Sequence, residues 1–172
     1  NYNGVSIDGL SAADIVGLGI AMVPEGRRLF PSLNVEENLL MGGYKRRQGH
    51  WTLDRIYELF PALVERRTVP GTALSGGEQQ MTAIGRALMT NPDLLLFDEL
   101  SLGLAPIIIK DIYQTLPTIK SEGVSILLVE QDINQALSVS DRVYCFQEGR
   151  VSLNGLPNTL SREQISAAYF GS

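Results

Sequence analysis

The segment Leu-Ser-Gly-Gly-Glu-Gln-Gln, residues 74–80, decides how the rest of the sequence is interpreted. Ser75 and Glu78 have the Ser-x-x-Glu spacing of a capping box, which predicts a helix that begins just after Ser75. This spacing does not explain Gly76 and Gly77, because glycine weakens a helical turn. Two glycines there would let a ligand approach the backbone, and the N–H groups of a helix N-terminus favour phosphate. The segment therefore indicates either a plain helix start or a phosphate site.

A second block, Leu-Leu-Leu-Phe-Asp-Glu at residues 94–99, lies one predicted helix further along the chain. Its apolar run has the length and character of a strand that is buried on both faces of a parallel sheet. Such a strand delivers its last residues to the carboxyl edge of the sheet, where α/β proteins bind ligands. Of Asp98 and Glu99, one can then hold Mg²⁺, directly or through water, and the other can orient or deprotonate an attacking water. A buried strand that merely ends in two acids is the alternative.

The segments around these blocks predict an α/β fold with a mainly parallel sheet, because strands and helices alternate along the chain. Hydrophobic periodicity, capping residues and turn residues locate the individual elements. The N-terminal part should contain a short strand in 4–9, a helix capped by Ser11, a strand over 20–23, and a helical insertion over about 30–73 that includes helices after Asn34 and over 53–60. The middle part should contain the helix after Ser75, the strand over 94–97, a helix over 107–120 and a strand over 124–129. The C-terminal part should contain a helix capped by Asp132, an antiparallel hairpin over 142–153 with a three-residue turn at 147–149, and a last helix capped by Ser161 and Gln164.

Composition narrows the class of protein. The 172 residues are 44% hydrophobic and 19% charged, which is typical of a globular domain with a real core. The formal net charge is −5 with scattered basic residues, which argues against a nucleic-acid binder. A single cysteine, Cys145, allows no disulfide within the chain, so a reducing compartment is expected. No apolar stretch is long enough to span a bilayer, and the absence of an initiator Met indicates a piece of a longer protein.

The order and spacing of the two blocks resemble the ATP-binding cassette (ABC) ATPases. The resemblance covers nearly the whole chain and implies a partial P-loop NTPase core with an inserted helical signature subdomain and a C-terminal antiparallel hairpin. It divides the chain into 1–30, the rest of the N-terminal core with the glutamine-loop equivalent; 31–90, the helical subdomain and signature helix; and 91–172, the C-terminal core with the Walker B strand, switch region, hairpin and last helix. The site residues that it implies are Asp98 for the metal, Glu99 and Gln131 for catalysis, and Ser75, Gly76, Gly77, Glu78 and Glu25 for the nucleotide.

Three segments, residues 23–30, 75–81 and 128–131, are similar to one subfamily, the second ATPase of Liv-type branched-chain amino acid importers. Most ABC ATPases have Gln where this chain has Glu25, and His where it has Gln131, and the subfamily shares both departures. Leu100 differs, since the family usually has Pro there. Loss of the fixed φ of proline should loosen the turn that aims Glu99. Arg27 and Arg28 fit either a solvated loop or a contact with phosphate or a permease.

The phosphate-cradling motif Gly-x-x-x-x-Gly-Lys-[Ser/Thr] occurs nowhere in the sequence. Together with the resemblance, this implies the C-terminal portion of an ABC ATPase whose parent binds ATP and Mg²⁺ and hydrolyses ATP, while the fragment alone is inactive. The residues 101–105 match the segment that crosses to the partner subunit in this family.

The resemblance also implies partners. We expect a second ABC ATPase subunit, as a homo- or heterodimer, and membrane permease subunits at the cytoplasmic face of the membrane, with no nucleic acid. The signature loop at Ser75 would then close over ATP held by the other subunit. Two alternatives remain: a non-catalytic module that only docks on a permease or partner ATPase, and a soluble ABC protein of DNA repair or translation, although the coiled-coil inserts and tandem cassettes of the latter are not seen.

Overall fold

The structure is a computed structural model that describes residues 1–45 and 47–170 of the chain. The chain forms two compact units, Asn1–Val129 and Glu130–Ser172. Residue 46, in the expected helical subdomain, and residues 171 and 172, in the expected C-terminal core, lie outside the described residues. The three-part division at residues 30 and 90 stays a prediction.

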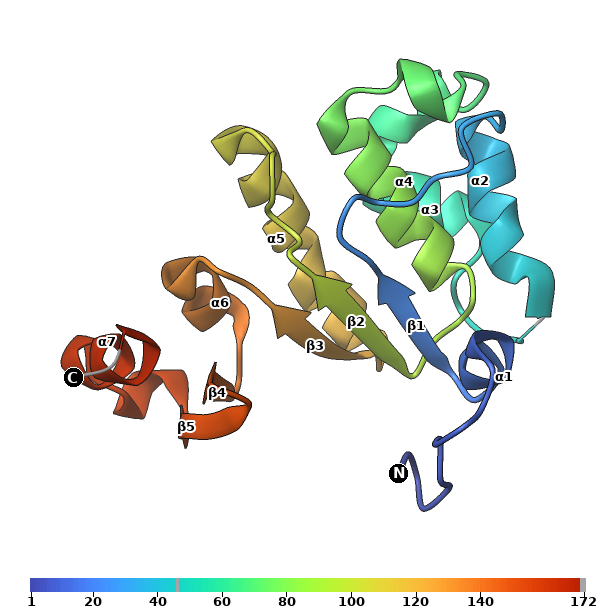
Figure 1. Cartoon of the computed structure of the whole chain (residues 1–172). Coiled ribbons are helices and arrows are strands. Elements are labelled where there is room, and N and C mark those ends of the chain that lie inside the picture. Colours follow the sequence, from blue (N-terminus) through green and yellow to red (C-terminus); the bar gives the residue numbers. More distant parts are fainter. Residues whose placement is uncertain (46, 171–172) are drawn as a thin grey trace. The chain divides into compact units, whose positions relative to one another are not determined.

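The first unit alternates helices and strands as the sequence predicts (Figure 1). Its elements are α1 (Ala12–Gly17), β1 (Ile20–Val23), α2 (Val35–Gly42), the 3₁₀ turn η1 (Gly43–Lys45), α3 (Leu53–Leu59), η2 (Pro61–Arg66), η3 (Gly71–Ala73), α4 (Gly76–Leu88), β2 (Leu94–Asp98), α5 (Pro106–Ser121) and β3 (Ser125–Val129).

A three-stranded parallel sheet forms the centre of the first unit, in the order β1-β2-β3. Val23 pairs with Phe97, and Asp98 pairs with Val129, so the three strands end along one edge. The helix α5 connects β2 to β3, and the whole helical insertion connects β1 to β2. The predicted α/β architecture with a parallel sheet is therefore confirmed, and Asp98 lies at its carboxyl edge.

The apolar run over 124–129 also predicts a buried strand, and this expectation is wrong for β3. Leu95 and Phe97 of β2 are 0% and 1% exposed, but Leu127 and Val129 of β3 are each 51% exposed, and Met22 of β1 is 52% exposed. In the register of the sheet, Met22 lies beside Leu96 and Leu127, on the face opposite Leu95 and Phe97. The described residues cover one face far better than the other, which makes the burial alternate along each strand.

The helices α2, α3 and α4 form the predicted helical insertion, and they meet around Gly85. A Cβ at Gly85 would stand 2.6 Å from Leu39 Cδ2 and 2.7 Å from Ile56 Cγ2, so only glycine lets the three helices approach this closely. Leu39, Ile56, Leu63 and Ile84 are all fully buried there. This small core makes the insertion a packed body that carries α4 on the edge of the sheet beside β1 (Figure 1).

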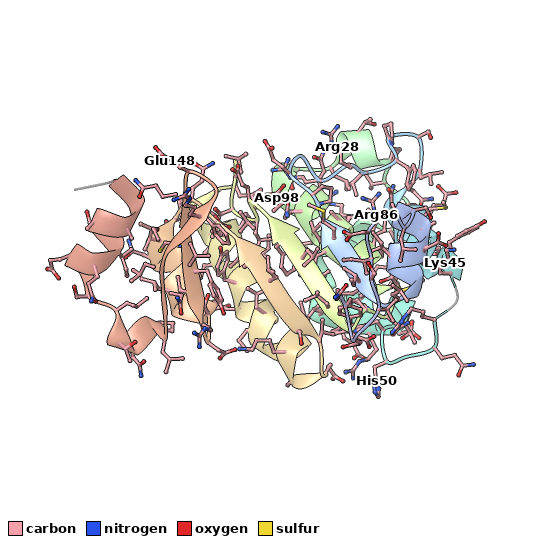
Figure 2. All side chains as sticks on the ribbon, turned by 60° about the horizontal axis from the view of Figure 1, so that its bottom comes forward. Arg28, Lys45, His50, Arg86, Asp98 and Glu148 are labelled. Carbon is pink, nitrogen blue, oxygen red and sulfur yellow. The ribbon has the colours of Figure 1, made fainter. Side chains whose placement is uncertain are left out.

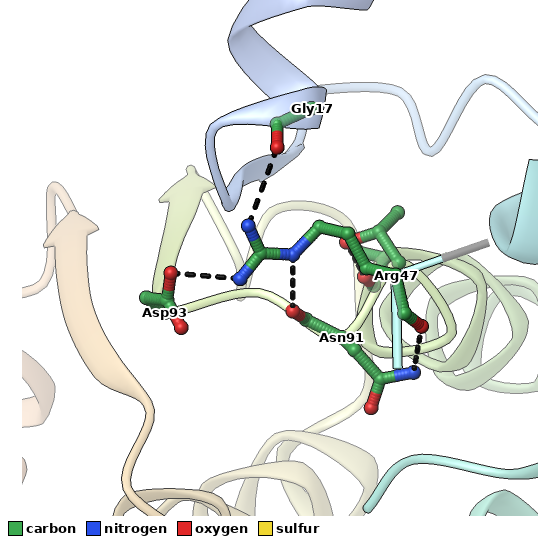
Figure 3. Close-up of polar contacts among 6 residues, drawn as sticks. Gly17, Arg47, Asn91 and Asp93 are labelled. Carbon is green, nitrogen blue, oxygen red and sulfur yellow. Dashed lines mark hydrogen bonds and ion pairs between the residues drawn. The ribbon is translucent and has the colours of Figure 1, made fainter. Parts of the chain in front are cut away.

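Arg47 ties the insertion to the amino end of the sheet (Figure 3). Its guanidinium donates to the carbonyl oxygens of Asn91 at 3.0 Å and Gly17 at 3.3 Å, and it forms an ion pair with Asp93 at 2.8 Å. Asn91 adopts a left-handed φ of 51°, which asparagine tolerates, and its amide donates back to the Arg47 carbonyl at 3.3 Å. These contacts anchor the end of the insertion opposite the carboxyl edge.

Two local expectations are wrong. The segment 4–9 is not a strand, because Tyr2 and Val5 bond to each other across a tight turn and no neighbouring strand lies alongside in the described part of the chain. The hairpin turn has two residues rather than three, since Gln147 pairs directly with Arg150. Glu148 and Gly149 both have positive φ, 49° and 75°, as two-residue hairpins of this kind require.

The second unit contains α6 (Ile133–Val139), the antiparallel pair β4 (Val143–Gln147) and β5 (Arg150–Gly155), η4 (Pro157–Thr159) and α7 (Arg162–Phe170). Asp132 caps α6 by accepting from the backbone of Asn134 and Gln135, and Ser161 and Gln164 bond reciprocally at the start of α7, as predicted. Over residues 1–45 and 47–170, no helix combines the length and the apolar character needed to cross a bilayer.

Candidate functional site

The start of α4 is a complete capping box, as the sequence predicts. Ser75 Oγ accepts from the Glu78 backbone at 3.3 Å, and the Ser75 backbone donates to the Glu78 carboxylate at 2.7 Å. Arg66 donates to the second carboxylate oxygen at 2.8 Å. Partial burial alone would raise the pKa of Glu78, but the hydrogen bonds from Ser75 and Arg66 outweigh it and hold the pKa below its usual value. Glu78 is therefore an ionised carboxylate whose two oxygens fix the first turn of α4.

The two glycines after Ser75 have different surroundings. A Cβ at Gly77 would stand 2.7 Å from Ile108 Cγ2, so the close approach of α5 requires glycine there. A Cβ at Gly76 would have Arg27 and Leu104 as its nearest neighbours, at 3.5 Å, an ordinary contact distance. Packing thus explains Gly77, for which ligand access was one of the two interpretations of the sequence, and only Gly76 is left without a structural reason.

The first amides of α4 can still serve an anion. The N–H groups of Gly76 and Gly77 occupy helix positions that have no partner within the helix, at the positive end of its dipole. Ser75 is exposed and Gly76 is partly exposed, so this end of α4 is open to a ligand. A phosphate is the kind of group that such a helix start binds.

The carboxyl edge holds Asp98 and Glu99 in a tight turn after β2. The Glu99 backbone donates to the Val129 carbonyl at 3.0 Å, and the Glu99 carbonyl accepts from Leu102 at 3.2 Å. Glu99 has a φ of 50°, in the left-handed region that glutamate rarely occupies. Backbone strain of this kind is held in place by surrounding structure and is common at functional sites. Here Leu100, only 1% exposed, anchors the turn by burial.

Asp98 could act as one ligand of a magnesium ion at the carboxyl edge. Its half-buried carboxylate stands at the end of β2, and Mg²⁺ typically takes one or two carboxylates together with phosphates and waters. Within the described residues, no three His, Cys, Asp or Glu side chains gather into a metal site of their own. His50 lies at the other end of the first unit from Asp98 (Figure 2). Asp98 therefore offers one carboxylate ligand to a metal ion at this edge.

The remaining predicted residues lie at strand ends. Glu25 is exposed and follows β1 by two residues, which puts it at the same carboxyl edge as Asp98. Gln131 is exposed, follows β3 by two residues and belongs to the second unit. The structure thus brings Glu25, Asp98 and Glu99 to one edge of the sheet.

Arg27 has a place that the sequence did not indicate. Its guanidinium donates to the side-chain oxygen of Gln80 at 3.1 Å and of Gln79 at 3.4 Å, both on α4, and to the Leu102 carbonyl at 3.4 Å. Neither of the two expectations for this loop, solvent exposure or contact with phosphate or a permease, included these partners. No spacing pattern could reveal them, because Arg27 and Gln80 are 53 residues apart in the sequence.

A crevice of about 560 Å³ lies elsewhere in the first unit, between α3, η2 and α5. It is lined by side chains that include Trp51, Arg55 and Asp111, and by none of the predicted site residues. This crevice is therefore separate from the residues of the carboxyl edge.

Comparison with known proteins agrees with this geometry. The ABC transporter family model matches residues 1–101. The chain is 47% identical over 173 residues to the high-affinity branched-chain amino acid transport ATP-binding protein BraG of Pseudomonas aeruginosa, and the match covers 99% of this chain and 74% of BraG. It is 34% identical to a probable branched-chain amino acid transport ATP-binding protein, LivF, of Archaeoglobus fulgidus, over 92% of this chain and 68% of LivF.

Solved structures share the fold. A crystal structure of the ADP conformation of an ATP-binding cassette, MJ1267, aligns with a TM-score of 0.74 at 24% identity over 93% of this chain and 71% of that chain. A dimeric cassette bound to ADP and Pi, MJ0796, aligns with a TM-score of 0.73 at 22% identity over 90% of this chain and 71% of that one. The sequence match, the parallel sheet and the capped α4 lead to one assignment: the chain belongs to the ABC transporter family of ATP-binding proteins.

Proposed function

We propose that this chain is part of the ATP-hydrolysing subunit of an importer that takes up branched-chain amino acids. The observation that carries the proposal is the 47% identity to BraG over 99% of the chain. The amino acid substrate rests on the functions named for BraG and LivF.

Each residue at the carboxyl edge has a role in this proposal. Asp98 binds Mg²⁺, whose charge would stabilise the phosphates during hydrolysis. Glu99 accepts a hydrogen bond from the attacking water and polarises it, and the strained turn that Leu100 anchors sets the direction of its carboxylate. Gln131, which belongs to the second unit, has the role of switch residue that the family resemblance implies. Glu25, exposed after β1, responds to the nucleotide and passes the response to the helical insertion.

The start of α4 serves a second subunit. The amides of Gly76 and Gly77 and the hydroxyl of Ser75 bind the phosphate of an ATP molecule that a partner ATPase holds, and Glu78 keeps the first turn in shape for this contact. The partner is a second ABC ATPase subunit, identical or different, and the pair docks on membrane permease subunits at the cytoplasmic face of the membrane.

ATP turnover by the full-length protein and its Glu99→Gln variant tests the proposal. Loss of a general base typically lowers kcat by about 10²–10⁴-fold. Glu148→Gln is a matched control, because Glu148 has nearly the same left-handed φ, 49° against 50°, but lies in the β4–β5 turn. Wild-type turnover in Glu99→Gln would show that Glu99 is not the base. No turnover in the wild type would leave the non-catalytic docking module as the function.

A further inference from the structure

The side chain of Arg27 joins three segments that the proposed function uses. It reaches from the loop after β1, which contains Glu25, to the first turns of α4 and to the segment after Glu99. We propose that Arg27 is a positioning residue, which holds the N-terminus of α4 in the orientation that ATP hydrolysis needs. The inference rests on the proposed function for its consequence, and on the contacts of Arg27 for its geometry.

The contacts of Arg27 are directional and distributed over one planar group. Nε donates to Gln80 Oε1 at 3.1 Å, Nη1 to Gln79 Oε1 at 3.4 Å, and Nη2 to the Leu102 carbonyl at 3.4 Å. Gln80 is only 5% exposed, so its oxygen depends on this donor for a charge-assisted bond away from water. A lysine has the charge but not the fork of donors, and cannot make all three contacts together.

Gln79 extends the contact to the loop before α4. Its amide nitrogen donates to the carbonyl oxygens of Gly71 and Leu74, each at 3.2 Å, while its oxygen accepts from Arg27. The chain of bonds therefore runs from Arg27 through Gln79 to Leu74, the residue before Ser75. Both the segment that enters α4 and the first turns of α4 are held by one guanidinium.

The backbone of Arg27 is also fixed by contacts with α4. Arg27 has a φ of 64°, a left-handed conformation that a non-glycine residue adopts at a cost. Its carbonyl accepts from Arg86 Nη2 at 3.0 Å, and the Arg86 guanidinium lies 5.4 Å from the centre of the Phe30 ring. Figure 2 labels Arg86, which comes from α4. The helix α4 thus bonds to both the side chain and the backbone carbonyl of Arg27.

Helix stability alone does not explain this arrangement. The guanidinium nitrogens lie 3.5 Å and 3.6 Å from the position of a Cβ at Gly76, at the N-terminus of α4. A cation is unfavourable at this end of a helix dipole. The hydrogen bonds therefore hold a positive group at a place where it does not stabilise α4 through the helix dipole. This supports a role in positioning the start of the helix.

Hydrogen exchange on the full-length protein tests the positioning without depending on turnover. Arg27→Ala removes the guanidinium but keeps the Cβ, so the preference of residue 27 for its left-handed φ changes little. We expect the amides of residues 75–80 and 102–104 to exchange about tenfold faster, while β4 and β5 are unchanged. Arg28→Ala is the control, because Arg28 is exposed and its side chain makes no hydrogen bond or ion pair with the described residues. Exchange at 75–80 should stay as in wild type. Unchanged exchange in Arg27→Ala overturns the inference.

Steady-state kinetics distinguishes a loss of positioning from a loss of folded protein. We expect Arg27→Ala to lower kcat about tenfold or more with KM for ATP little changed, and Arg27→Lys not to restore kcat. Recovery by lysine, or wild-type kcat in Arg27→Ala, overturns the inference and leaves the proposed function standing. If the wild type itself has no turnover, the proposed function fails and the exchange result alone decides the inference. Should Arg27→Ala not fold, Gln80→Met, which removes the acceptor at similar size, is judged by the same exchange and kcat outcomes.

Discussion

Gly77 of α4 lies against Ile108 of α5 so closely that a Cβ at Gly77 would stand 2.7 Å from Ile108 Cγ2. The contact joins the start of α4 to α5, the helix that follows the acidic turn. Ile108 is branched at Cβ, so its Cγ2 cannot swing away by a rotation near the end of the side chain.

Gly77→Ala should therefore destabilise the chain by about 1–3 kcal/mol, because one of the two helices must shift. Urea unfolding of the variant and the wild type measures the loss. In the background Ile108→Ala the same substitution should cost much less, since the obstructing methyl is gone. An equal cost in both backgrounds would contradict the contact.

Gly76→Ala should behave in the opposite way. A Cβ at Gly76 meets nothing closer than 3.5 Å, so the free energy of unfolding should change by less than about 1 kcal/mol. If a phosphate approaches the Gly76 amide, the added methyl should still lower ATP turnover by the full-length protein about tenfold or more. Normal turnover together with normal stability would show that ligand access is not the reason for this glycine.

Leu100→Pro should destabilise the chain, although proline is what the family usually has at this place. Leu100 is 1% exposed, and truncating a buried leucine costs about 2–5 kcal/mol. Proline also pushes the preceding residue towards extended conformations, whereas Glu99 has a φ of 50°.

Leu100→Met keeps the volume and should cost less than about 1.5 kcal/mol. Thermal or urea unfolding of the two variants gives the comparison. Equal stability of Leu100→Pro and the wild type would mean that burial of Leu100 is not what holds the turn.

Glu78 should make stability depend on pH in the acid range. The pKa of Glu78 in the folded chain lies below its usual 4.5, because the bonds from Ser75 and Arg66 outweigh the effect of burial. A lowered pKa contributes stability that is fully present above pH 4.5 and is lost as the pH falls through the folded pKa.

Glu78→Gln keeps the shape of the cap but not its charge. The variant should be less stable than the wild type at pH 7, by about 0.5–2 kcal/mol, and the two should converge in acid. Urea unfolding at pH 7 and at pH 3 measures the difference. A difference that stays constant between the two pH values would show that the carboxylate is not the source.

Local sequence signals located the elements well. Asn34 and Glu37, Ser75 and Glu78, and Ser161 and Gln164 all form the expected reciprocal caps, since both members of each pair lie within one helical turn. The apolar run at 94–97 was correctly predicted as a parallel strand, because its length and flanking residues are local properties. These signals were enough for the α/β fold and for Asp98 at the carboxyl edge.

Expectations failed where the answer depended on a neighbour. The segment 4–9 has strand-like residues, but it finds no strand to pair with among the described residues. The hairpin turn was one residue too long, because the pairing of Gln147 with Arg150 sets the register. Burial of β3 depended on what covers Leu127 and Val129, which the run of apolar residues cannot specify.

By itself, the sequence determined most of the segments that become helices and strands, where the capped helix α4 begins, and that two carboxylates follow the central strand. These features depend on residues that are close together in the chain. Only the tertiary structure decided that Gly77 serves the packing of Ile108, that Glu99 has a left-handed backbone, and that Arg27 holds α4 through Gln79 and Gln80. Contacts over 31 to 53 residues depend on how helices and strands pack in space, and no spacing along the chain encodes that packing.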